Sequence, residues 1–351
     1  MKIESHIKLE SDRMNWCVHP SFFWVKNAYK VACNELSLLS ANERRSVVVV
    51  ASFPPIGPLL VGKKLADVWS TPLCIDYRDV WFGLGVTQVS RISPLNVLYL
   101  FNAYLRHCIE KSACAAVVVS EGQKTMHEAQ SDLAATTIPN GVDFALLSGS
   151  RYQRSSKIFP ITIRYFGRIF PPNRTPKPLL EALAAIPNKE RKFHVEFYGT
   201  SPDQLLPLIH QWGCAHVCSI HPLLSHEKCL ELQRSADMLL HLDWRDENSR
   251  GVISGKVYEY LVSGRPILLI GGSTQSDLAK LIWSAHAGYV LGDVPESIRE
   301  FLRVLVHVPH EYLKPRSISN LVLQYDRKRL AGVYLRMLDQ LAEQGSLSEV
   351  L

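Results

Sequence analysis

Residues 249–269 read SRGVISGKVYEYLVSGRPILL, and this stretch predicts a loop, a short helix, a glycine turn and a buried strand in succession. The predicted helix begins just after small residues, so its free backbone N–H groups and the positive end of its dipole face outward. A helix start of this kind is a ready site for an anion. The stretch therefore combines a helix–turn–strand unit with an anion site.

Two charged residues of the same helix extend this interpretation. Lys256 places a mobile positive charge in the first turn, and Glu259, three residues on, shares its helix face. A cation and free amides suit a phosphate, and the carboxylate can accept two hydrogen bonds from sugar hydroxyls. The pair therefore suits a nucleotide-sugar site. The alternative is an ordinary surface Lys–Glu pair, and spacing alone favours that alternative, because such pairs are common and weak.

Composition limits the class of protein. The 351 residues suit two domains, and 47% hydrophobic with 21% charged residues is typical of a globular chain. The net charge of +6 suits phosphate-bearing ligands or an anionic membrane surface, but it is too small and scattered to indicate nucleic acid. No apolar run approaches the ~20 residues of a membrane span, and the polar N-terminus lacks a signal-peptide core. We predict a cytoplasmic protein, soluble or peripheral on the inner face of the membrane.

The eight cysteines include no Cys-x-x-Cys pair, and several lie in apolar stretches, as Cys74 does. They predict reduced core thiols of a cytoplasmic protein and not a disulfide framework. Cys214 and Cys218 lie near His216 and His221, but the spacing fits no standard zinc site. We therefore predict no metal and no cofactor.

Short apolar strands alternate with longer helices from residue 47 onward. Val47–Ala51 is β-branched and uncharged, which is typical of a strand buried on both faces. The predicted strands span 47–51, 73–76, 115–119, 136–138, 161–166, 194–198, 217–220, 238–242, 266–270 and 289–291. The predicted helices span 16–39, 59–68, 94–112, 121–130, 177–186, 203–211, 226–235, 255–262, 276–284 and 295–306. This alternation predicts α/β architecture with parallel sheets, whose ligands lie beyond the carboxyl ends of the strands.

A polar, basic stretch at 148–157 interrupts the alternation and predicts an interdomain linker. We expect a first domain at 1–148 and a second, nucleotide-sugar-binding domain at 149–324. Helices at 325–351 follow, and one alternative is that they pack back on the first domain.

The motif G-K-x-x-E-Y-L-x-x-G-R-P-I at 255–267 resembles the donor-binding motif of the retaining glycosyltransferases of family four. Other segments resemble the motifs of that family in the same order. They are ASFPP at 51–55, DYRDVW at 76–81, SEG at 120–122, IPNGVD at 138–143, YFGR at 165–168 and ADMLL at 236–240. The resemblance implies the GT-B fold, in which two Rossmann-like domains face a cleft. It also implies retaining, metal-independent transfer of a hexosyl group from a UDP- or GDP-linked sugar. The acceptor would be a saccharide or lipid-linked, as in surface polysaccharide, lipopolysaccharide or glycolipid synthesis.

The sequence departs from the family in two places. The family usually begins with a strand and a glycine-rich loop, but the first 45 residues hold no such unit, so we expect the first domain to lack its initial strand–helix–strand unit. Many relatives also carry a glutamate eight positions before the residue that matches Glu259. That position is Gly251 here, with Asp246 and Glu247 as nearby substitutes. Both departures favour a second reading, a non-catalytic member that binds a nucleotide sugar or a partner protein, and a nucleotide-sugar epimerase is a third.

The resemblance also assigns roles to single residues. Arg168 and Lys256 would contact the diphosphate and neutralise its growing charge, and Asp79 would orient or deprotonate the acceptor. The proposed donor-binding residues are Gly167, Arg174, Lys177, Gly255, Glu259, Gly272 and Ser273. For the second phosphate cation, Arg174 and Lys177 remain equal alternatives. The competing interpretations are a surface arginine at 168, an Arg–Asp structural network around Asp79, and a plain turn at the glycines.

Two apolar stretches could contact a lipid surface and a lipid-linked acceptor. They are Phe22–Trp24 and the predicted helix segment Leu95–Phe101, which ends near basic residues. Ordinary core packing is the alternative, and it is slightly favoured.

Overall fold

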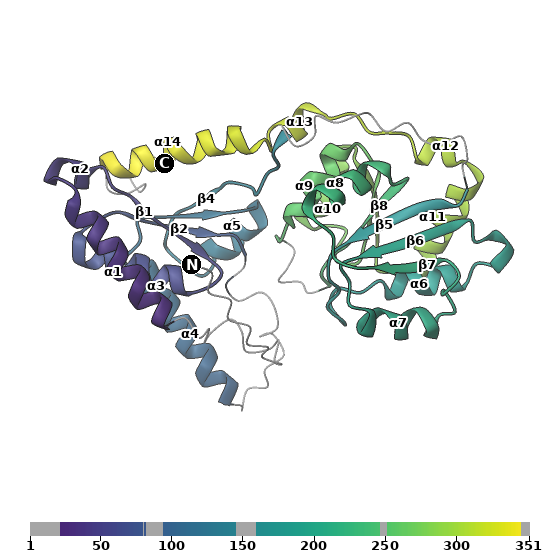
Figure 1. Ribbon diagram of the computed structural model, residues 1–351, viewed down its shortest axis with the longest axis horizontal. Helices are drawn as coiled ribbons and strands as arrows, with labels where there is room; N and C mark the ends of the chain where they lie inside the picture. Colours follow the sequence, from purple (N-terminus) through teal and green to yellow (C-terminus); the bar gives the residue numbers. More distant parts are fainter. Residues whose placement is uncertain (1–21, 80, 82–93, 145–158, 246–250, 345–351) are drawn as a thin grey trace. The chain divides into compact units, whose positions relative to one another are not determined.

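The computed structural model of the protein describes residues 22–79, 81, 94–144, 159–245 and 251–344. These residues form two compact units (Figure 1). Unit 1 takes the described residues up to Val119, those from Gln123 to Ile138, and those from Val333 onward. Unit 2 takes Ser120–Gly122 and the described residues from Pro139 to Gly332. The predicted linker at 148–157 lies outside the described residues.

Unit 1 is built on a parallel sheet with the strand order β1-β2-β3-β4. Its strands are β1 (Val49–Phe53), β2 (Leu73–Tyr77), β3 (Ala115–Val118) and β4 (Ala135–Thr137). Its helices are α1 (Phe22–Leu38), α2 (Ala41–Arg45), α3 (Gly57–Trp69), α4 (Pro94–Glu110), most of α5 (Glu121–Glu128) and the second half of α14 (Arg327–Gln344). Apolar side chains of α3 and α4, including Leu59 and Ile109, pack with the sheet residues in one core.

The first strand corrects one prediction. The run at Val47–Ala51 was expected to be buried on both faces, but β1 is an edge of the sheet that the described residues form. Ala51 and Phe53 point into the core, whereas Val50, on the other face, is 41% exposed. The apolar run correctly predicts a parallel strand. An apolar sequence alone does not reveal whether that strand has a neighbour on one side or on both.

Unit 2 contains a parallel sheet with the strand order β10-β9-β8-β5-β6-β7. Its strands are β5 (Ile161–Phe166), β6 (Phe193–Tyr198), β7 (Cys218–His221), β8 (Met238–Leu242), β9 (Ile267–Ile270) and β10 (Gly288–Gly292). Its α-helices are α6 (Lys177–Ala184), α7 (Pro202–Gln211), α8 (His226–Ser235), α9 (Gly255–Ser263), α10 (Asp277–Ser284), α11 (Pro295–His307), α12 (Pro309–Tyr312) and α13 (Asn320–Leu323). A short 3-10 helix covers Asn188–Glu190.

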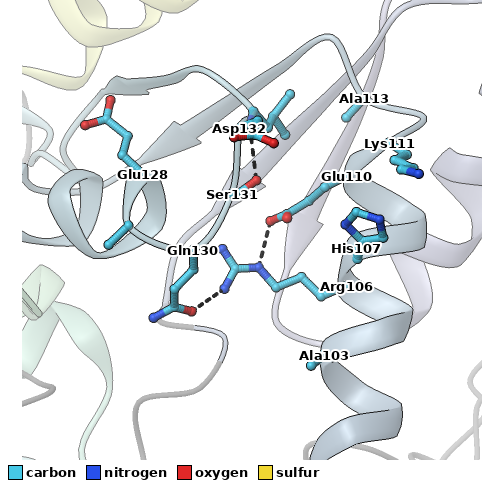
Figure 2. A pocket seen from close by; sticks show the side chains of 12 residues that line it. Ala103, Arg106, His107, Glu110, Lys111, Ala113, Glu128, Gln130, Ser131 and Asp132 are labelled. Carbon is cyan, nitrogen blue, oxygen red and sulfur yellow. Dashed lines mark hydrogen bonds and ion pairs between the residues drawn. The ribbon is translucent and has the colours of Figure 1, made fainter.

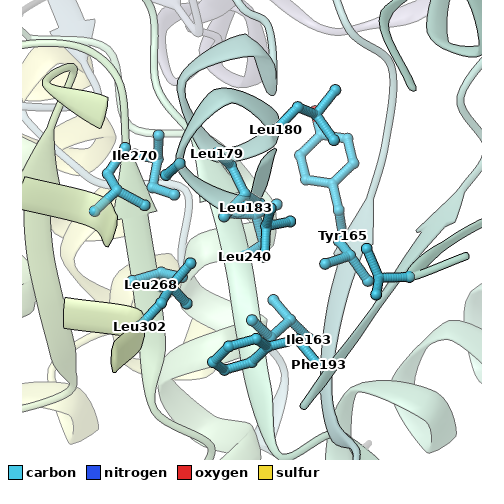
Figure 3. Close-up of a cluster of buried hydrophobic side chains, with 14 of the residues drawn as sticks. Ile163, Tyr165, Leu179, Leu180, Leu183, Phe193, Leu240, Leu268, Ile270 and Leu302 are labelled. Atoms are coloured by element: carbon cyan, nitrogen blue, oxygen red, sulfur yellow. The ribbon is translucent and has the colours of Figure 1, made fainter. Parts of the chain in front are cut away.

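Apolar clusters cover both faces of the unit 2 sheet. Figure 3 shows the first, in which Leu179 and Leu183 of α6 and Leu302 of α11 surround strand residues such as Ile163 and Leu240. The second cluster joins the opposite face to α8, α9, α10 and α13. All five residues of β8 are buried, as expected for a parallel strand covered on both faces. The prediction of α/β architecture with two parallel sheets is thus confirmed.

Candidate functional site

Residues 249–269 contain α9, which begins at Gly255 as predicted and ends at Ser263, one residue later than predicted. Ser254 has extended backbone angles and precedes the helix, and Gly264 ends it in the left-handed conformation, with φ of 71°. Val257, Tyr258 and Tyr260 are among its buried residues, so one side of the helix is fixed on the sheet. The Ser254 side chain does not cap the helix start, which leaves its first N–H groups available to an anion.

Lys256 lies at the carboxyl end of β5. Its Nζ donates a 2.7 Å hydrogen bond to the carbonyl oxygen of Phe166 and lies 5.3 Å from the ring centroid of Tyr165. Gly167 makes this approach possible, because a Cβ at that position would lie 2.3 Å from Nζ. Burial, followed by repulsion from Arg174, lowers the lysine pKa to about 8. The surroundings of Lys256 therefore stabilise its positive charge less well than water does, as a site that awaits an anion requires.

The loop after β5 holds a second cation near the first. Phe170 and Arg174 exchange two backbone hydrogen bonds, of 2.7 and 2.8 Å, which close the turn between them. The Arg174 guanidinium carbon lies 4.7 Å from the ring centroid of Trp244. The Arg174 charge also contributes to the lowered pKa of Lys256.

Two further predicted cations are exposed. Arg168 follows Gly167, and its backbone oxygen accepts a 2.7 Å hydrogen bond from the Tyr165 hydroxyl, while its side chain faces solvent. Lys177 begins α6 and is also exposed, and its backbone N–H donates to Thr175 Oγ1. Of the two alternatives for the second phosphate cation, Arg174 is the one whose charge contributes to the lowered pKa of Lys256.

Glu259 contacts two residues of α8. Its Oε1 lies 2.9 Å from Nε2 of His226, and its Oε2 accepts a 3.0 Å hydrogen bond from Gln233. The carboxylate is 18% exposed. Because a carboxylate offers about four lone-pair positions, these two contacts orient it and leave capacity for hydroxyl groups of a ligand.

Asp243, a residue that the sequence analysis missed, follows β8 and is 5% exposed. Its Oδ1 accepts a 2.9 Å hydrogen bond from the Trp244 backbone, and burial raises its pKa to about 6. Glycines are required opposite it. A Cβ at Gly272 would lie 2.5 Å from its Oδ2, and a Cβ at Gly271 2.9 Å from its carbonyl oxygen. The Ser273 hydroxyl accepts a 3.1 Å hydrogen bond from the Gln275 backbone and so stabilises the turn.

His241, also missed, is the last polar residue within β8. Its ring is buried, and burial followed by the charges of Lys256 and Arg174 lowers its pKa well below the usual value. Its Nδ1 has no hydrogen-bond partner among the described residues. A neutral imidazole therefore lies close to the two cations. The signal in the sequence was a His and an Asp at the carboxyl end of an apolar strand, where ligands of parallel sheets bind.

Asp79 lies in unit 1, beyond the carboxyl end of β2. Its backbone oxygen accepts a 3.0 Å hydrogen bond from Gln123. Nearby, the Arg78 Nε donates a 2.8 Å charged hydrogen bond to Asp76, as the structural-network interpretation expected. Trp81 stacks on Phe53 with ring centroids 4.4 Å apart and packs against the unit 1 core. The structure thus gives Asp76 and Trp81 structural contacts.

Unit 1 also contains a hollow of about 660 Å³ between the ends of α4 and α5 (Figure 2). Its wall carries the buried Arg106, which donates 2.7 and 2.9 Å hydrogen bonds to Glu110 and Gln130. The hollow includes Ala113 and Leu133, which precede β3 and β4, so it lies at the amino ends of these strands. Ligands of parallel sheets bind at the carboxyl ends. The bonded Arg106–Glu110 pair therefore has a structural role here.

Among the residues with assigned positions, no cluster of three potential metal-binding side chains occurs. Asp246 and Glu247 lie outside those residues. The helices that the structure describes include none that is both long and apolar enough to cross a bilayer.

This chain is similar in fold to several proteins of known structure. No protein-family model matches the chain, and no curated protein matches it. Among solved structures, Anabaena HepE in complex with UDP and glucose has a TM-score of 0.65 at 13% identity, over 91% of this chain and 81% of that one. Sucrose-phosphate synthase from Thermosynechococcus elongatus has a TM-score of 0.65 at 12% identity, over 97% and 85%. The lipopolysaccharide outer core galactosyltransferase WaaB has a TM-score of 0.59 at 15% identity, over 91% and 81%. The chain thus has the two-sheet α/β fold of these GT-B glycosyltransferases.

Proposed function

We propose that this protein is a glycosyltransferase that moves a hexosyl group from a nucleotide sugar to a saccharide or lipid-linked acceptor. The observation that carries the proposal is Lys256, a cation with little compensation beside the uncapped start of α9. Arg174 adds a second cation, and both lie where parallel strands end. The similar folds of HepE, which binds UDP and UDP-glucose, and WaaB, a galactosyltransferase, support the same function.

The chemistry follows from the charge that develops in the reaction. The acceptor oxygen attacks the anomeric carbon, the bond from that carbon to the phosphate oxygen breaks, and the nucleoside diphosphate leaves with the electron pair. Two fixed cations and a helix start stabilise that charge without reorganising. We assign this task to Lys256 and Arg174, with Arg168 as a third, exposed cation. No protein nucleophile is assigned, in agreement with the proposed retaining, metal-independent mechanism, in which the acceptor proton passes to the departing phosphate.

The other predicted residues are assigned accordingly. Glu259, held by His226 and Gln233, would accept hydrogen bonds from the ribose hydroxyls. The turn at Gly272 and Ser273 would bring backbone groups close to the nucleotide. Gly255 begins α9, where its amide would face an anion, and Lys177 begins α6, where its side chain would supply a further cation. Asp79 would orient the acceptor from unit 1.

Calorimetric titration with UDP and GDP tests the donor site. We expect micromolar binding of one of them, reduced about 10- to 150-fold in Lys256→Met, because a buried charged hydrogen bond is worth about 1.5–3 kcal/mol. Lys228→Met is the matched control, since Lys228 is exposed on α8 and pairs only with Glu231 among its described contacts. Absence of binding by folded protein would contradict the proposal.

Product analysis with the donor that binds then separates the remaining functions. A larger saccharide means a transferase, and a free epimer formed without acceptor means an epimerase. Binding without either product means a non-catalytic member, which the Gly251 departure favours.

Contact with a membrane is a further part of the proposal, because Trp24 and Phe101 are 50% and 57% exposed. The side chains of Phe22, Phe23 and residues 94–100 lie outside those described. Flotation with phosphatidylglycerol vesicles should carry the protein upward, and less so after Trp24→Ser. A protein that stays at the bottom of the gradient would exclude this contact and leave the donor site unaffected.

A further inference from the structure

We propose that Trp244 is a positioning residue that holds the Arg174 guanidinium beside Lys256, so that two cations together bind the diphosphate. This role rests on the proposed function, and it concerns a residue that the sequence motifs do not include. Trp244 follows Asp243 at the end of β8, whereas Arg174 belongs to the loop after the neighbouring strand β5.

Trp244 and Arg174 are in direct contact. The Arg174 guanidinium carbon lies 4.7 Å from the Trp244 ring centroid, within the range of a cation–π interaction. Like charges repel, and Arg174 also lowers the pKa of Lys256, so an arginine free to rotate would move away from the lysine. The aromatic face compensates this repulsion and keeps the two cations close before any ligand arrives.

Trp244 is itself fixed by its neighbours. Its backbone N–H donates a 2.9 Å hydrogen bond to Asp243 Oδ1, and its ring stacks on Phe170 with centroids 5.6 Å apart and planes 21° apart. Phe170 and Arg174 are joined through both backbone hydrogen bonds of the turn. Trp244 therefore contacts both ends of the turn and fixes its conformation.

Arg245, the residue after Trp244, also contacts this turn. The Arg245 N–H donates a 3.0 Å hydrogen bond to the carbonyl oxygen of Asn173, inside the same turn. Its guanidinium pairs with Asp293 at 2.7 Å, just after β10. The loops after β5 and β8 are thus joined by main chain and side chain, and β10 is linked to them by an ion pair. Such a preformed arrangement reduces the cost of ordering the cations when a diphosphate binds.

The test compares UDP with uridine, because only UDP carries the phosphates that the cations would bind. UDP affinity is measured by calorimetry and uridine affinity by titration NMR, for the wild type, Trp244→Leu, Arg174→Met and the double variant. We expect Arg174→Met to lower the UDP-to-uridine affinity ratio about 10- to 100-fold, and Trp244→Leu about 5- to 10-fold. The double variant should stay within about twofold of Arg174→Met, because both changes remove the same interaction.

Two further variants keep the test decisive. Trp244→Phe retains an aromatic face and should keep most of the wild-type ratio, whereas Trp283→Leu, on the exposed side of α10, should change nothing. An unchanged ratio in Trp244→Leu, an equal loss of UDP and uridine affinity, or multiplying losses in the double variant would overturn the positioning role. A folded wild-type protein that binds no UDP would instead overturn the proposed function, and this role with it.

Discussion

Replacement of Lys256 by methionine should stabilise the fold while it weakens diphosphate binding. The lysine pKa falls from 10.5 to about 8 on folding, chiefly because burial disfavours the charged form. A difference of that size costs the folded protein about 3 kcal/mol at pH 7. Methionine has a similar length and no charge, so it removes this cost, but it leaves the Phe166 carbonyl oxygen without its donor, a loss of about 1 kcal/mol. The net gain in the free energy of unfolding is about 2 kcal/mol.

The pH dependence of that gain identifies its origin. The folded state of the wild type binds the lysine proton more weakly than the unfolded state, so its stability rises with pH between the two pKa values. The cost is fully present below pH 8 and disappears above 10.5. The advantage of Lys256→Met should therefore be largest at pH 7 and smaller at pH 9.5.

Urea unfolding of the wild type and of Lys256→Met at pH 7 and pH 9.5 measures the difference in stability. Thermal unfolding at pH 7 should show a midpoint about 4–8 °C higher for the variant. Lys228→Met, the exposed control, should leave both midpoints unchanged. A variant that is less stable than the wild type at pH 7, or an advantage that does not shrink with pH, would refute the reasoning. In that case the lysine would be a structural partner and not a cation reserved for a ligand.

Three other outcomes are expected. Gly167→Ala should lose UDP binding and about 1–3 kcal/mol of stability, because φ of Gly167 is 136° and the new Cβ would meet Lys256 Nζ. Calorimetry measures the binding and urea unfolding measures the stability. Normal UDP binding would refute the predicted clash between this Cβ and Lys256. Asp243→Asn should raise the free energy of unfolding by up to about 3 kcal/mol at pH 7.5, because burial raises the pKa of the Asp243 carboxyl to about 6. For the same reason, the wild type should become more stable as the pH falls from 6 toward 4. A stability–pH profile that keeps this slope in the variant would contradict the assignment. Arg106→Leu should cost about 3–5 kcal/mol of stability, because the buried Glu110 carboxylate loses its guanidinium partner and keeps, among the described hydrogen bonds, only the one from Tyr77. Urea unfolding of the whole protein measures this cost. UDP affinity should stay constant, and a lost affinity would show that the hollow serves the donor site.

Local pattern predicted most of the secondary structure. The boundaries predicted for β5, β8 and α8 agree with the structure. Apolar residues alternate with polar ones in β5, β8 is apolar except for His241, and a serine cap marks the start of α8. Strand order and edge position were not accessible, since four consecutive valines look the same whether one or two strands lie beside them. For this reason the exposure of Val50 was not predicted.

The candidate site shows the same division. Motif and spacing predicted Lys256 and Glu259, but not the groups they contact. Lys256 bonds to a carbonyl 90 residues away, and Glu259 is held by two residues of a different helix. Asp243 and Trp244 were missed because their roles depend on a neighbouring loop, which only the sheet order brings close. Tertiary contacts therefore decide how each charged group is used.

The glycines of this site have a consequence for genetic screens. Positions 167, 271 and 272 contribute no side chain, yet a single added carbon atom at each would meet Lys256 or Asp243. In a library of all single substitutions, these three positions should tolerate as little change as Lys256 itself. A map of tolerated variation would thus outline the donor site through residues that touch no ligand with a side chain, and a search restricted to charged residues would overlook them.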